Sequence, residues 1–387
     1  MARVFLPFLE QDNKTMKPKV LVTREVFNDV LEYLRQHFEV TDNQADTPME
    51  AEALARSLAD KTGAMTTLVD RVDAKLLSRC PKLKAVCNIA VGFNNIDLAA
   101  CSKAGVMATN TPGVLDDSTA DFTWALILST ARRVVESDAH VRAGEWKGWY
   151  LKQFLSADVH HAILGILGFG RIGRRVARRA LGFDMTVLYH DSQRAEAATE
   201  RSCNAAFVSM DELLSRADIL TIHVPYAPST HHLVGSRELA KMKPGAILIH
   251  AARGGVVDDA AMVEALKSGR LAGAGLDVFE NEPTLNPAFL GMRNVVLTPH
   301  IASSSAITSK LSTAGALSSS SESTHGAVAA RYARLLASIP RFSFMARNRT
   351  AGNARRVIST VSSVEPLSAT ITSCHWSSGR QISESVL

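Results

Sequence analysis

The feature that most constrains the fold is a glycine-rich loop between an apolar run and a helical stretch. The run Ile163–Leu167 is followed by Gly168-Phe-Gly-Arg-Ile-Gly173 and then by helical spacing as far as Leu181. In such a loop the first glycine permits a tight turn, the second lets a ligand approach the backbone, and the third lets the helix pack close to the strand. A strand, this loop and a helix in succession bind a pyrophosphate at the helix N-terminus. The motif therefore predicts a dinucleotide site on a doubly wound parallel sheet.

Short apolar runs alternate with helical stretches on both sides of this loop. Helical spacing covers Glu25–Phe38, and one long helical pattern extends from Asp117 to Gly144. Runs typical of strands are Lys19–Thr23, Ala85–Ile89 and Val106–Thr109 before the loop, and Ile163–Leu167, Met185–Tyr189, Ile219–His223, Ala246–His250, Gly273–Asp277 and Val295–Thr298 from the loop onward. The alternation predicts an α/β chain, and the last six runs suit one parallel sheet.

An acid follows the second strand of the predicted dinucleotide unit. Asp191 lies 18 residues beyond Gly173, close to where an acid binds the hydroxyls of the adenosine ribose. Its charge would repel a 2′-phosphate, so we predict NAD as the cofactor. NADP stays the alternative, because Arg194 lies nearby and would oppose the acid. The ordinary interpretation of Asp191 is a solvated turn residue.

Three polar side chains follow later strands of the same predicted sheet. They are Arg253, Glu282 and His300. The carboxyl ends of parallel strands lie at the edge of an open sheet where ligands bind, so these groups would meet beside the cofactor. Taken singly, they have ordinary interpretations as a surface ion pair, a loop acid and a polar residue at a strand end. Together, downstream of a dinucleotide loop, they indicate hydride transfer to a keto acid.

Each of these side chains matches one need of that reaction, because the cofactor itself supplies the hydride. His300 is the candidate proton donor, since an imidazole titrates near neutral pH. Glu282 would orient the imidazole and raise its pKa. Arg253 would bind the substrate carboxylate through its planar fork and polarise the carbonyl. Asp277 is a candidate contact for the nicotinamide amide, with a capping role as its alternative.

Composition and charge exclude several other classes of protein. Residues 305–387 hold nine Lys/Arg and three Glu, so the first 304 residues carry a net charge of about −1, and we expect no specific nucleic-acid partner. No apolar run approaches the roughly 20 residues of a membrane span, so we expect no membrane partner. The five cysteines form no Cys-x-x-Cys pair. We therefore expect a cytoplasmic protein without a metal site.

Several motifs occur together in one order along residues 17–304. They are Val91-Gly-Phe-Asn-Asn-Ile-Asp97, Ala120-Asp121, Gly168–Gly173, Ala252-Arg-Gly254, Asp277-Val-Phe-Glu-Asn-Glu-Pro283 and Pro299-His-Ile301. With them the sequence resembles the D-2-hydroxyacid dehydrogenase family, and within it the glyoxylate/hydroxypyruvate reductases. The resemblance implies two Rossmann-like doubly wound parallel-sheet domains, with the cofactor domain inserted into a split substrate domain. The implied parts are an N-terminal extension (1–16), a substrate domain (17–112), an NAD(P)-binding domain (113–299) and an atypical C-terminal segment (300–387).

The same resemblance implies roles for individual residues. Arg253, Glu282 and His300 take the three roles derived above, and the Val91 and Gly92 amides would hold the substrate carboxylate. The implied cofactor contacts are Gly168, Phe169, Gly170, Arg171, Ile172, Gly173, Asp191, Ser192, Gln193, Ala251, Ala252, Arg253 and Asp277. The resemblance also implies a homodimer, with the helix near 117–144 in the interface. Candidate side chains of the substrate pocket are Met65, Thr66, Phe93 and Trp149.

The C-terminal segment departs from the family pattern. Relatives continue past the His motif with an apolar helix that returns to the substrate domain, whereas here Ser- and Arg-rich sequence follows, with low complexity at Ser318–Ser323. We hypothesise a frame change after about Ser304, and the other reading frames of the gene would test it. Loss of that helix would expose apolar surface and reduce stability or activity. At the other end, Met16 is a candidate start that an intact mass would test.

The predicted reaction is NAD(P)H-dependent reduction of glyoxylate or hydroxypyruvate to the D-2-hydroxy acid, and its reverse. A 2-ketogluconate reductase is the alternative with the same chemistry and a bulkier substrate. An alternative of another class is an NAD-sensing binding protein, which would bind cofactor without turnover. A third is an enzyme inactivated by its altered C-terminus. Cofactor binding without NADH oxidation on any keto acid would indicate one of the last two.

Overall fold

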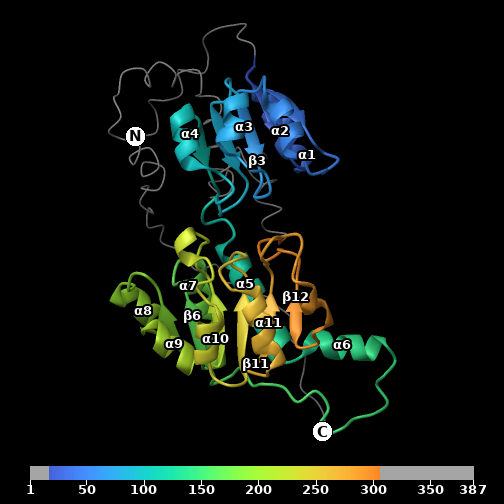
Figure 1. Cartoon of the computed structure of the whole chain (residues 1–387), viewed down its shortest axis with the longest axis vertical. Helices are drawn as coiled ribbons and strands as arrows, with labels where there is room; N and C mark the ends of the chain where they lie inside the picture. Colours follow the sequence, from blue (N-terminus) through green and yellow to red (C-terminus); the bar gives the residue numbers. More distant parts are fainter. Residues whose placement is uncertain (1–16, 306–387) are drawn as a thin grey trace, which may run out of the picture. The chain divides into compact units, whose positions relative to one another are not determined.

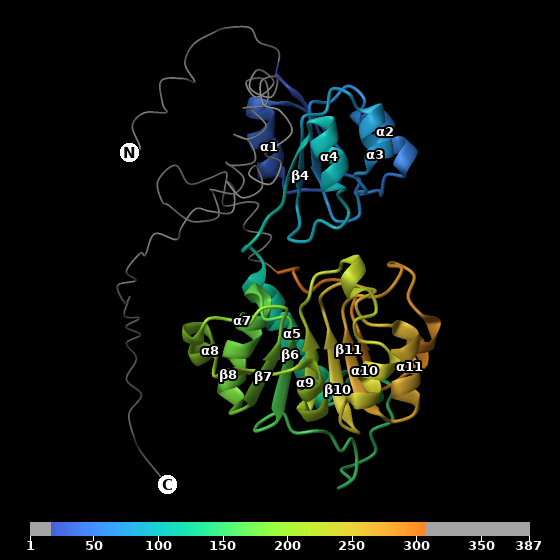
Figure 2. The same cartoon turned by 60° about the vertical axis from the view of Figure 1, so that its left-hand side comes forward.

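A computed structural model describes residues 17–305 of the chain. In it the described chain forms two parallel β-sheets with helices packed on them (Figure 1, Figure 2). The N-terminal extension, the alternative start at Met16, the frame-change hypothesis and the returning segment of the split substrate domain lie outside the described residues. The two sheets lie within 17–112 and 113–299, and these domain boundaries themselves stay predictions.

The first sheet has five strands in the order β2-β1-β3-β4-β5, all parallel. Successive residues of a strand point to opposite faces, and β1 shows this directly. Val20 and Val22 pack with α1, whereas Leu21 packs with the helices of the other face. The elements are β1 (Lys19–Val22), α1 (Asn28–His37), β2 (Glu39–Asp42), α2 (Ala51–Leu58), β3 (Gly63–Thr66), α3 (Ala74–Arg79), β4 (Ala85–Asn88), α4 (Leu98–Ala104) and β5 (Met107–Thr109).

The second sheet has seven parallel strands in the order β12-β11-β10-β9-β6-β7-β8. In β10, Leu248 packs with one helical layer and Ile249 with the other. The strands are β6 (Ile163–Leu167), β7 (Thr186–His190), β8 (Ala205–Phe207), β9 (Ile219–Ile222), β10 (Ala246–His250), β11 (Leu271–Leu276) and β12 (Val295–Leu297). The helices are α5 (Asp116–Ala131), α6 (Val134–Arg142), α7 (Arg171–Ala180), α8 (Ala197–Cys203), α9 (Met210–Arg216), α10 (Ser236–Lys241) and α11 (Asp259–Lys267), with short 3-10 turns at Leu181–Phe183, Pro228–Thr230 and Pro287–Gly291.

The predicted strands all form, but the sequence missed three others. β2 and β8 lie at sheet edges, and their sequences Glu-Val-Thr-Asp and Ala-Ala-Phe are too polar or too short to stand out. β3 is fully buried, yet its sequence Gly-Ala-Met-Thr has small side chains and only one large apolar residue. The second sheet therefore has seven strands where six were predicted. Pairing with a neighbouring strand, rather than local β propensity, makes these segments extended.

The prediction of one long helix from Asp117 to Gly144 is wrong. The backbone of Arg133 has a φ of 52°, in the left-handed region, and it separates α5 from α6. The break is stabilised locally, because Arg133 pairs with Glu136 through two nitrogens at 2.8 and 2.9 Å. Apolar residues continue past the break at Val134 and Val135, so the sequence pattern gave no sign of it.

Helix α5 packs directly on the second sheet and joins that domain. Trp124 stacks on Phe183 at a centroid separation of 4.6 Å, and its indole N–H donates to the carbonyl of Val176 at 3.0 Å. Ile127 is fully buried in the same layer. An aromatic side chain with a satisfied polar end adds both apolar burial and direction to a core. This packing holds α5 against α7, the helix that follows the glycine loop.

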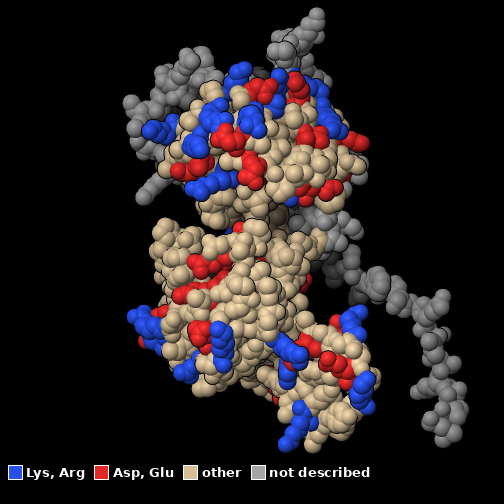
Figure 3. All heavy atoms as spheres, turned by 45° about the vertical axis from the view of Figure 1, so that its right-hand side comes forward, with Lys and Arg blue, Asp and Glu red and all other residues tan. Residues whose placement is uncertain are grey.

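The surface of the described residues carries charges of both signs. Figure 3 shows Lys/Arg and Asp/Glu side chains interspersed on the face it displays.

Cys80, Cys87, Cys101 and Cys203 are buried free thiols. Among the described helices, none has both the length and the apolar character needed to span a bilayer.

Candidate active site and dinucleotide site

The glycine loop lies where the strand order of the second sheet reverses. β6 pairs with β7 on one side and β9 on the other, so the chain winds in opposite directions from this point. Gly168 has a φ of 93°, and a Cβ there would lie 2.7 Å from the carbonyl carbon of His223, after β9. A Cβ on Gly173 would lie 2.2 Å from the carbonyl oxygen of Gly168. Open α/β sheets bind their ligands at such a switch point.

The start of α7 fits the pyrophosphate of a dinucleotide. Its N-cap is Gly170, which offers no side chain to the first backbone N–H groups. Among the described residues, no heavy atom outside the immediate chain neighbours lies within 4 Å of a Cβ built on Gly170. The exposed N–H groups and the helix dipole favour an anion here. Phe169 stacks on Tyr189 and is buried, so only its backbone is available to a cofactor.

Replacing Gly173 with alanine should destabilise this domain. The added methyl group would meet backbone and not a flexible side chain, and overpacking of this kind costs about 1–3 kcal/mol. Urea unfolding would measure the change. Gly182→Ala is the matched control, because no heavy atom lies within 4 Å of its added Cβ among the described residues and its φ is not positive. Equal stability of the two variants would contradict the close packing of α7 on the loop.

Asp191 lies at the end of β7 beside the loop. Its Oδ2 accepts a hydrogen bond from the Phe169 amide at 2.6 Å, and its Oδ1 accepts one from the Ser192 hydroxyl at 3.1 Å. The neighbouring Arg194 is already paired, since its guanidinium donates to both carboxylate oxygens of Glu200 at 2.9 and 3.0 Å. The predicted competition between Arg194 and Asp191 is therefore weaker than the sequence indicated. Roles of Asp191, Ser192 and Gln193 in ribose binding stay predictions.

His300 and Glu282 form the predicted imidazole–carboxylate pair. His300 Nδ1 lies 2.7 Å from Glu282 Oε2, while Glu282 Oε1 accepts a hydrogen bond from the Phe279 amide at 2.9 Å. Burial alone would raise the pKa of Glu282, but the hydrogen bonds from His300 and Phe279 and the charge of Arg253 outweigh it and lower the pKa below its usual value. Glu282 is therefore ionised at neutral pH. Its hydrogen bond with Nδ1 fixes the orientation of the imidazole ring.

Asp277 holds the segment that carries His300. It is fully buried, and it accepts hydrogen bonds from the Thr298 hydroxyl at 2.7 Å and from the amides of Ile301 and Ala302 at 2.8 Å each. These contacts flank His300 on both sides, and His300 has a φ of 56°. A non-glycine residue in that region costs energy and persists only where its surroundings hold it. The structure thus gives Asp277 a positioning role, and its contact with nicotinamide stays a prediction.

Arg253 reaches across to the loop after β4. A Cβ placed on Gly92 would lie 2.0 Å from an Nη atom of Arg253, so only a glycine leaves room for the guanidinium. Behind it, His250 is 1% exposed and lies 2.8 Å through Nε2 from the carbonyl oxygen of Arg253. Burial lowers the pKa of His250 to about 4, so it is neutral and its Nε2–H donates to that carbonyl. Burial also lowers the pKa of the Arg253 guanidinium, which nonetheless stays charged.

Val91 and Gly92 line the same cleft as Arg253. The Asn110 side chain donates to the carbonyl of Val91 at 2.8 Å, and the Asn88 side chain donates to that of Gly92 at 2.9 Å. In the described part of the chain, neither amide of the two residues donates a hydrogen bond. Asn88 and Asn110 were not predicted from the sequence. Their signal was an amide side chain at the carboxyl end of a strand, β4 for Asn88 and β5 for Asn110.

These groups line one cleft of about 700 Å³, a volume typical of small-molecule sites. The predicted residues that line it are Val91, Gly92, Ile172, Ala251, Ala252, Arg253 and His300, with Met65 and Phe93 of the candidate pocket side chains. The prediction is wrong for Thr66, which is buried and donates to Asn88. It is also wrong for Trp149, because this side chain is 81% exposed and does not line the cleft of its own chain.

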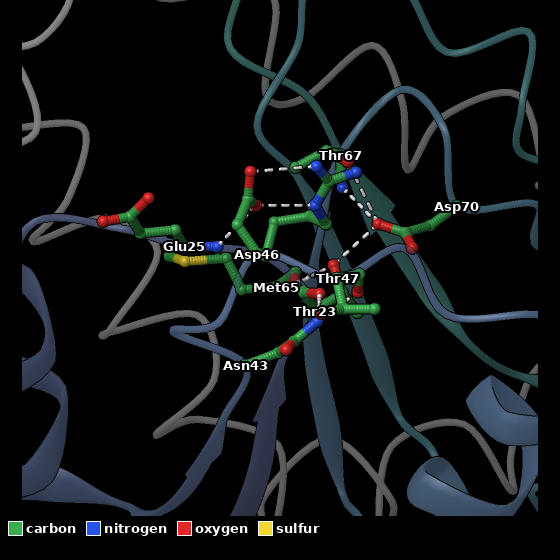
Figure 4. Close-up of polar contacts among 9 residues, drawn as sticks. Thr23, Glu25, Asn43, Asp46, Thr47, Met65, Thr67 and Asp70 are labelled. Atoms are coloured by element: carbon green, nitrogen blue, oxygen red, sulfur yellow. Dashed lines mark hydrogen bonds and ion pairs between the residues drawn. The ribbon is translucent and has the colours of Figure 1, made fainter.

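A polar network holds the loops of the first sheet that contribute to this cleft (Figure 4). The buried carboxylate of Asp70 accepts hydrogen bonds from the Thr23 hydroxyl at 2.6 Å and from the Thr67 amide at 2.8 Å. The Arg24 guanidinium donates to both oxygens of Asp46 at 2.7 and 3.0 Å. The loops after β1, β2 and β3 are thus tied together at the carboxyl edge of the sheet.

Comparison with known proteins agrees with this geometry. The family model for the NAD-binding domain of D-isomer specific 2-hydroxyacid dehydrogenases matches residues 124–302. A glyoxylate reductase of Thermococcus gammatolerans is 44% identical over 292 residues, which are 74% of this chain and 87% of that protein. The chain belongs to the D-isomer specific 2-hydroxyacid dehydrogenase family. It is therefore an oxidoreductase whose cofactor is NAD or NADP.

Solved structures of this dehydrogenase family share its two-domain architecture. A glyoxylate reductase from Paecilomyes thermophila aligns with a TM-score of 0.69 and 32% identity, over 78% of this chain and 94% of that one. An NADPH-dependent glyoxylate/hydroxypyruvate reductase from Sinorhizobium meliloti, in complex with NADP and malonate, gives the same TM-score and identity over 78% and 91%. The predicted class of two Rossmann-like parallel-sheet domains is confirmed for this dehydrogenase.

Proposed function

We propose that the enzyme uses NAD(P)H to reduce a small 2-keto acid of the glyoxylate and hydroxypyruvate type to the D-2-hydroxy acid, and catalyses the reverse reaction. The observation that carries this proposal is a single cleft lined by Arg253, His300 and the Val91–Gly92 loop, in which Arg253 lies against Gly92. The names of the glyoxylate reductases to which the chain is similar support the substrate class.

Each residue of the candidate site would have its own role in this reduction. When bound, the nicotinamide supplies the hydride. The guanidinium of Arg253 and the amides of Val91 and Gly92 would bind the substrate carboxylate and orient the neighbouring carbonyl. His300 would donate a proton from Nε2 to the carbonyl oxygen as the alcohol forms. The ionised Glu282, 2.7 Å from Nδ1, accepts a hydrogen bond from that nitrogen and keeps the ring in place.

A panel of keto acids tests the function. NADH and NADPH oxidation would be followed with glyoxylate, hydroxypyruvate, 2-ketogluconate and pyruvate, and we expect the highest kcat/KM on the first two. A higher kcat/KM on 2-ketogluconate would favour the alternative reductase. Cofactor binding without oxidation on any of them would favour an NAD-sensing protein or an inactive enzyme. The intact Arg253, Glu282 and His300 arrangement supports the catalytic proposal over these two.

The cofactor preference is proposed to be NAD. Asp191→Ala should lower the NADH over NADPH ratio of kcat/KM by about tenfold or more, because it removes a charge that repels a 2′-phosphate and a partner of the ribose hydroxyls. Steady-state rates with both cofactors would measure the ratio. Glu196→Ala is the control, since this exposed acid lies nearby at the start of α8. An unchanged ratio in Asp191→Ala would remove Asp191 from cofactor selection.

We further propose a homodimer built on α6 and the chain that follows it. This segment extends beyond the second sheet (Figure 1). Its exposed apolar side chains are Val134, Val135, Val141, Trp146, Trp149, Tyr150, Leu151 and Leu155. So many large apolar side chains on one segment indicate a protein interface, and a second copy is the partner that the family resemblance implies.

The free thiols of the described cysteines are in keeping with a cytoplasmic location.

Trp149→Ser combined with Leu151→Ser should convert the dimer to a monomer. Sedimentation or light scattering would report the mass, and the dissociation constant should rise by at least about 100-fold because two large apolar anchors are removed. Leu290→Ser is the matched control, since Leu290 is 70% exposed but lies on another part of the surface. A double variant that remains dimeric would place the interface elsewhere.

A further inference from the structure

Two adjacent histidines and a glutamate converge at the surface of the second domain. The potential ligand atoms of His231, His232 and Glu280 all lie within 4.8 Å of one another. His232 Nε2 lies 3.1 Å from Glu280 Oε1, and the two imidazole rings stack at a centroid separation of 3.9 Å with 24° between their planes. None of the three lines the catalytic cleft. They therefore form a cluster apart from the proposed chemistry.

The Nδ1 atom of each imidazole lies near a further polar group. His232 Nδ1 lies 3.8 Å from a carboxylate oxygen of Asp258, and His231 Nδ1 lies 3.4 Å from the Tyr226 hydroxyl. Histidines that bind a metal through one nitrogen commonly have a carboxylate or another polar group at the second nitrogen, which orients the ring. This arrangement leaves the Nε2 atoms of both rings for a shared ion.

Backbone hydrogen bonds hold the loops that carry the cluster. The amide of His232 donates to the carbonyl of Gly255 at 2.8 Å, which ties the segment before α10 to the loop after β10. The amide of Glu280 donates to Asp259 Oδ2 at 3.1 Å, which ties the loop after β11 to the start of α11. Because both loops are anchored, a bound ion would need only side-chain adjustment.

We propose that His231, His232 and Glu280 bind a divalent transition-metal ion of the zinc type. Two imidazole nitrogens and one carboxylate oxygen are ligands that Zn²⁺ prefers, whereas Mg²⁺ and Ca²⁺ prefer oxygen alone. A solvent molecule would complete the coordination, because His231 is exposed. The expectation of no metal site rested on the absence of paired cysteines. It could not detect ligands 48 residues apart that meet only after β9 and β11 align in the sheet.

The consequence is a metal-dependent gain in stability. An ion that binds only the folded protein stabilises it by an amount that grows with the logarithm of its concentration relative to its dissociation constant, and so raises the melting temperature. With the full chain, increasing ZnCl₂ should raise Tm progressively, and MgCl₂ at the same concentrations should not. His231→Asn and, separately, Glu280→Gln should each weaken Zn²⁺ binding at least tenfold by calorimetry. Both variants should retain NADH binding, which reports that the domain is folded.

The chain offers a matched control in a second histidine pair. His160 and His161 are also adjacent, with their rings 5.0 Å apart and Asp158 3.7 Å from His160. They do not form a three-ligand group among the described residues. His160→Asn combined with His161→Asn should therefore leave Zn²⁺ affinity and the Tm gain unchanged. The proposal is overturned if His231→Asn keeps the full affinity, or if Zn²⁺ binds the unaltered chain no more tightly than Mg²⁺.

Discussion

Replacing His300 with alanine is expected to lower kcat on a 2-keto acid by about 10²–10⁴-fold, the contribution of a well-placed general acid. The structure supports this size of effect, because Glu282 holds the imidazole at 2.7 Å and the backbone of His300 is itself fixed by Asp277. NADH affinity should stay nearly unchanged, since the glycine loop and Asp191 are untouched. Steady-state rates would give kcat, and quenching of protein fluorescence would give the NADH dissociation constant.

Two further variants separate a catalytic role of His300 from a general effect on the protein. His160→Ala removes an exposed histidine that does not line the cleft, and its activity should equal that of the unaltered enzyme. Glu282→Gln keeps the imidazole but replaces the carboxylate that accepts a hydrogen bond from its Nδ1, so it should lower kcat less than His300→Ala. Undiminished turnover in His300→Ala would remove this residue from the mechanism.

Replacing Arg253 with glutamine is expected to lower kcat/KM by about 10²–10⁴-fold. The substitution removes two charge-assisted hydrogen bonds to the substrate, each worth about 1.5–3 kcal/mol, and a tenfold rate change corresponds to about 1.4 kcal/mol. Arg253→Lys keeps the positive charge but loses the planar fork, so its loss should be smaller. Rates measured over a range of keto-acid concentrations would separate KM from kcat.

The contact between Arg253 and Gly92 allows a second test of whether Arg253 binds the substrate carboxylate. A methyl group on Gly92 would occupy the position of the guanidinium, so Gly92→Ala should raise KM although Arg253 is still present. Arg237→Gln is the control, because Arg237 is an exposed arginine paired with Glu238 on α10. If Arg253→Gln retains the original KM, the substrate carboxylate is bound by other groups.

Several elements of the fold were predictable from local pattern. Central parallel strands are buried on both faces and therefore have continuous apolar runs, as β6, β9 and β10 do. Strands with weak runs, such as β2 and β8, were missed because they depend on a neighbour for their pairing. The break at Arg133 was missed because apolar residues continue directly after it, at Val134 and Val135.

The candidate site, like the fold, could be predicted from the sequence only in part. Arg253, Glu282 and His300 were chosen because their chemistry follows predicted strands, and the structure brings all three to one edge of the sheet. Their supporting residues were not predictable to the same extent. For Asp277 the sequence left a nicotinamide contact and a capping role open, and the structure shows its carboxylate accepting from the amides beside His300. Asn88 and Asn110 hold the loop of Gly92 and had been overlooked.

The amino-acid sequence by itself was enough to predict the strand–glycine loop–helix unit, the class of cofactor and three candidate catalytic side chains, because each depends on residue types at short spacing. The tertiary structure alone decided that Arg253 lies against Gly92, that Asp277 supports His300, and that His231, His232 and Glu280 meet. These contacts join residues that are far apart in the chain. They follow from the order in which strands pair, and hydrophobic periodicity within a segment carries no information about that order.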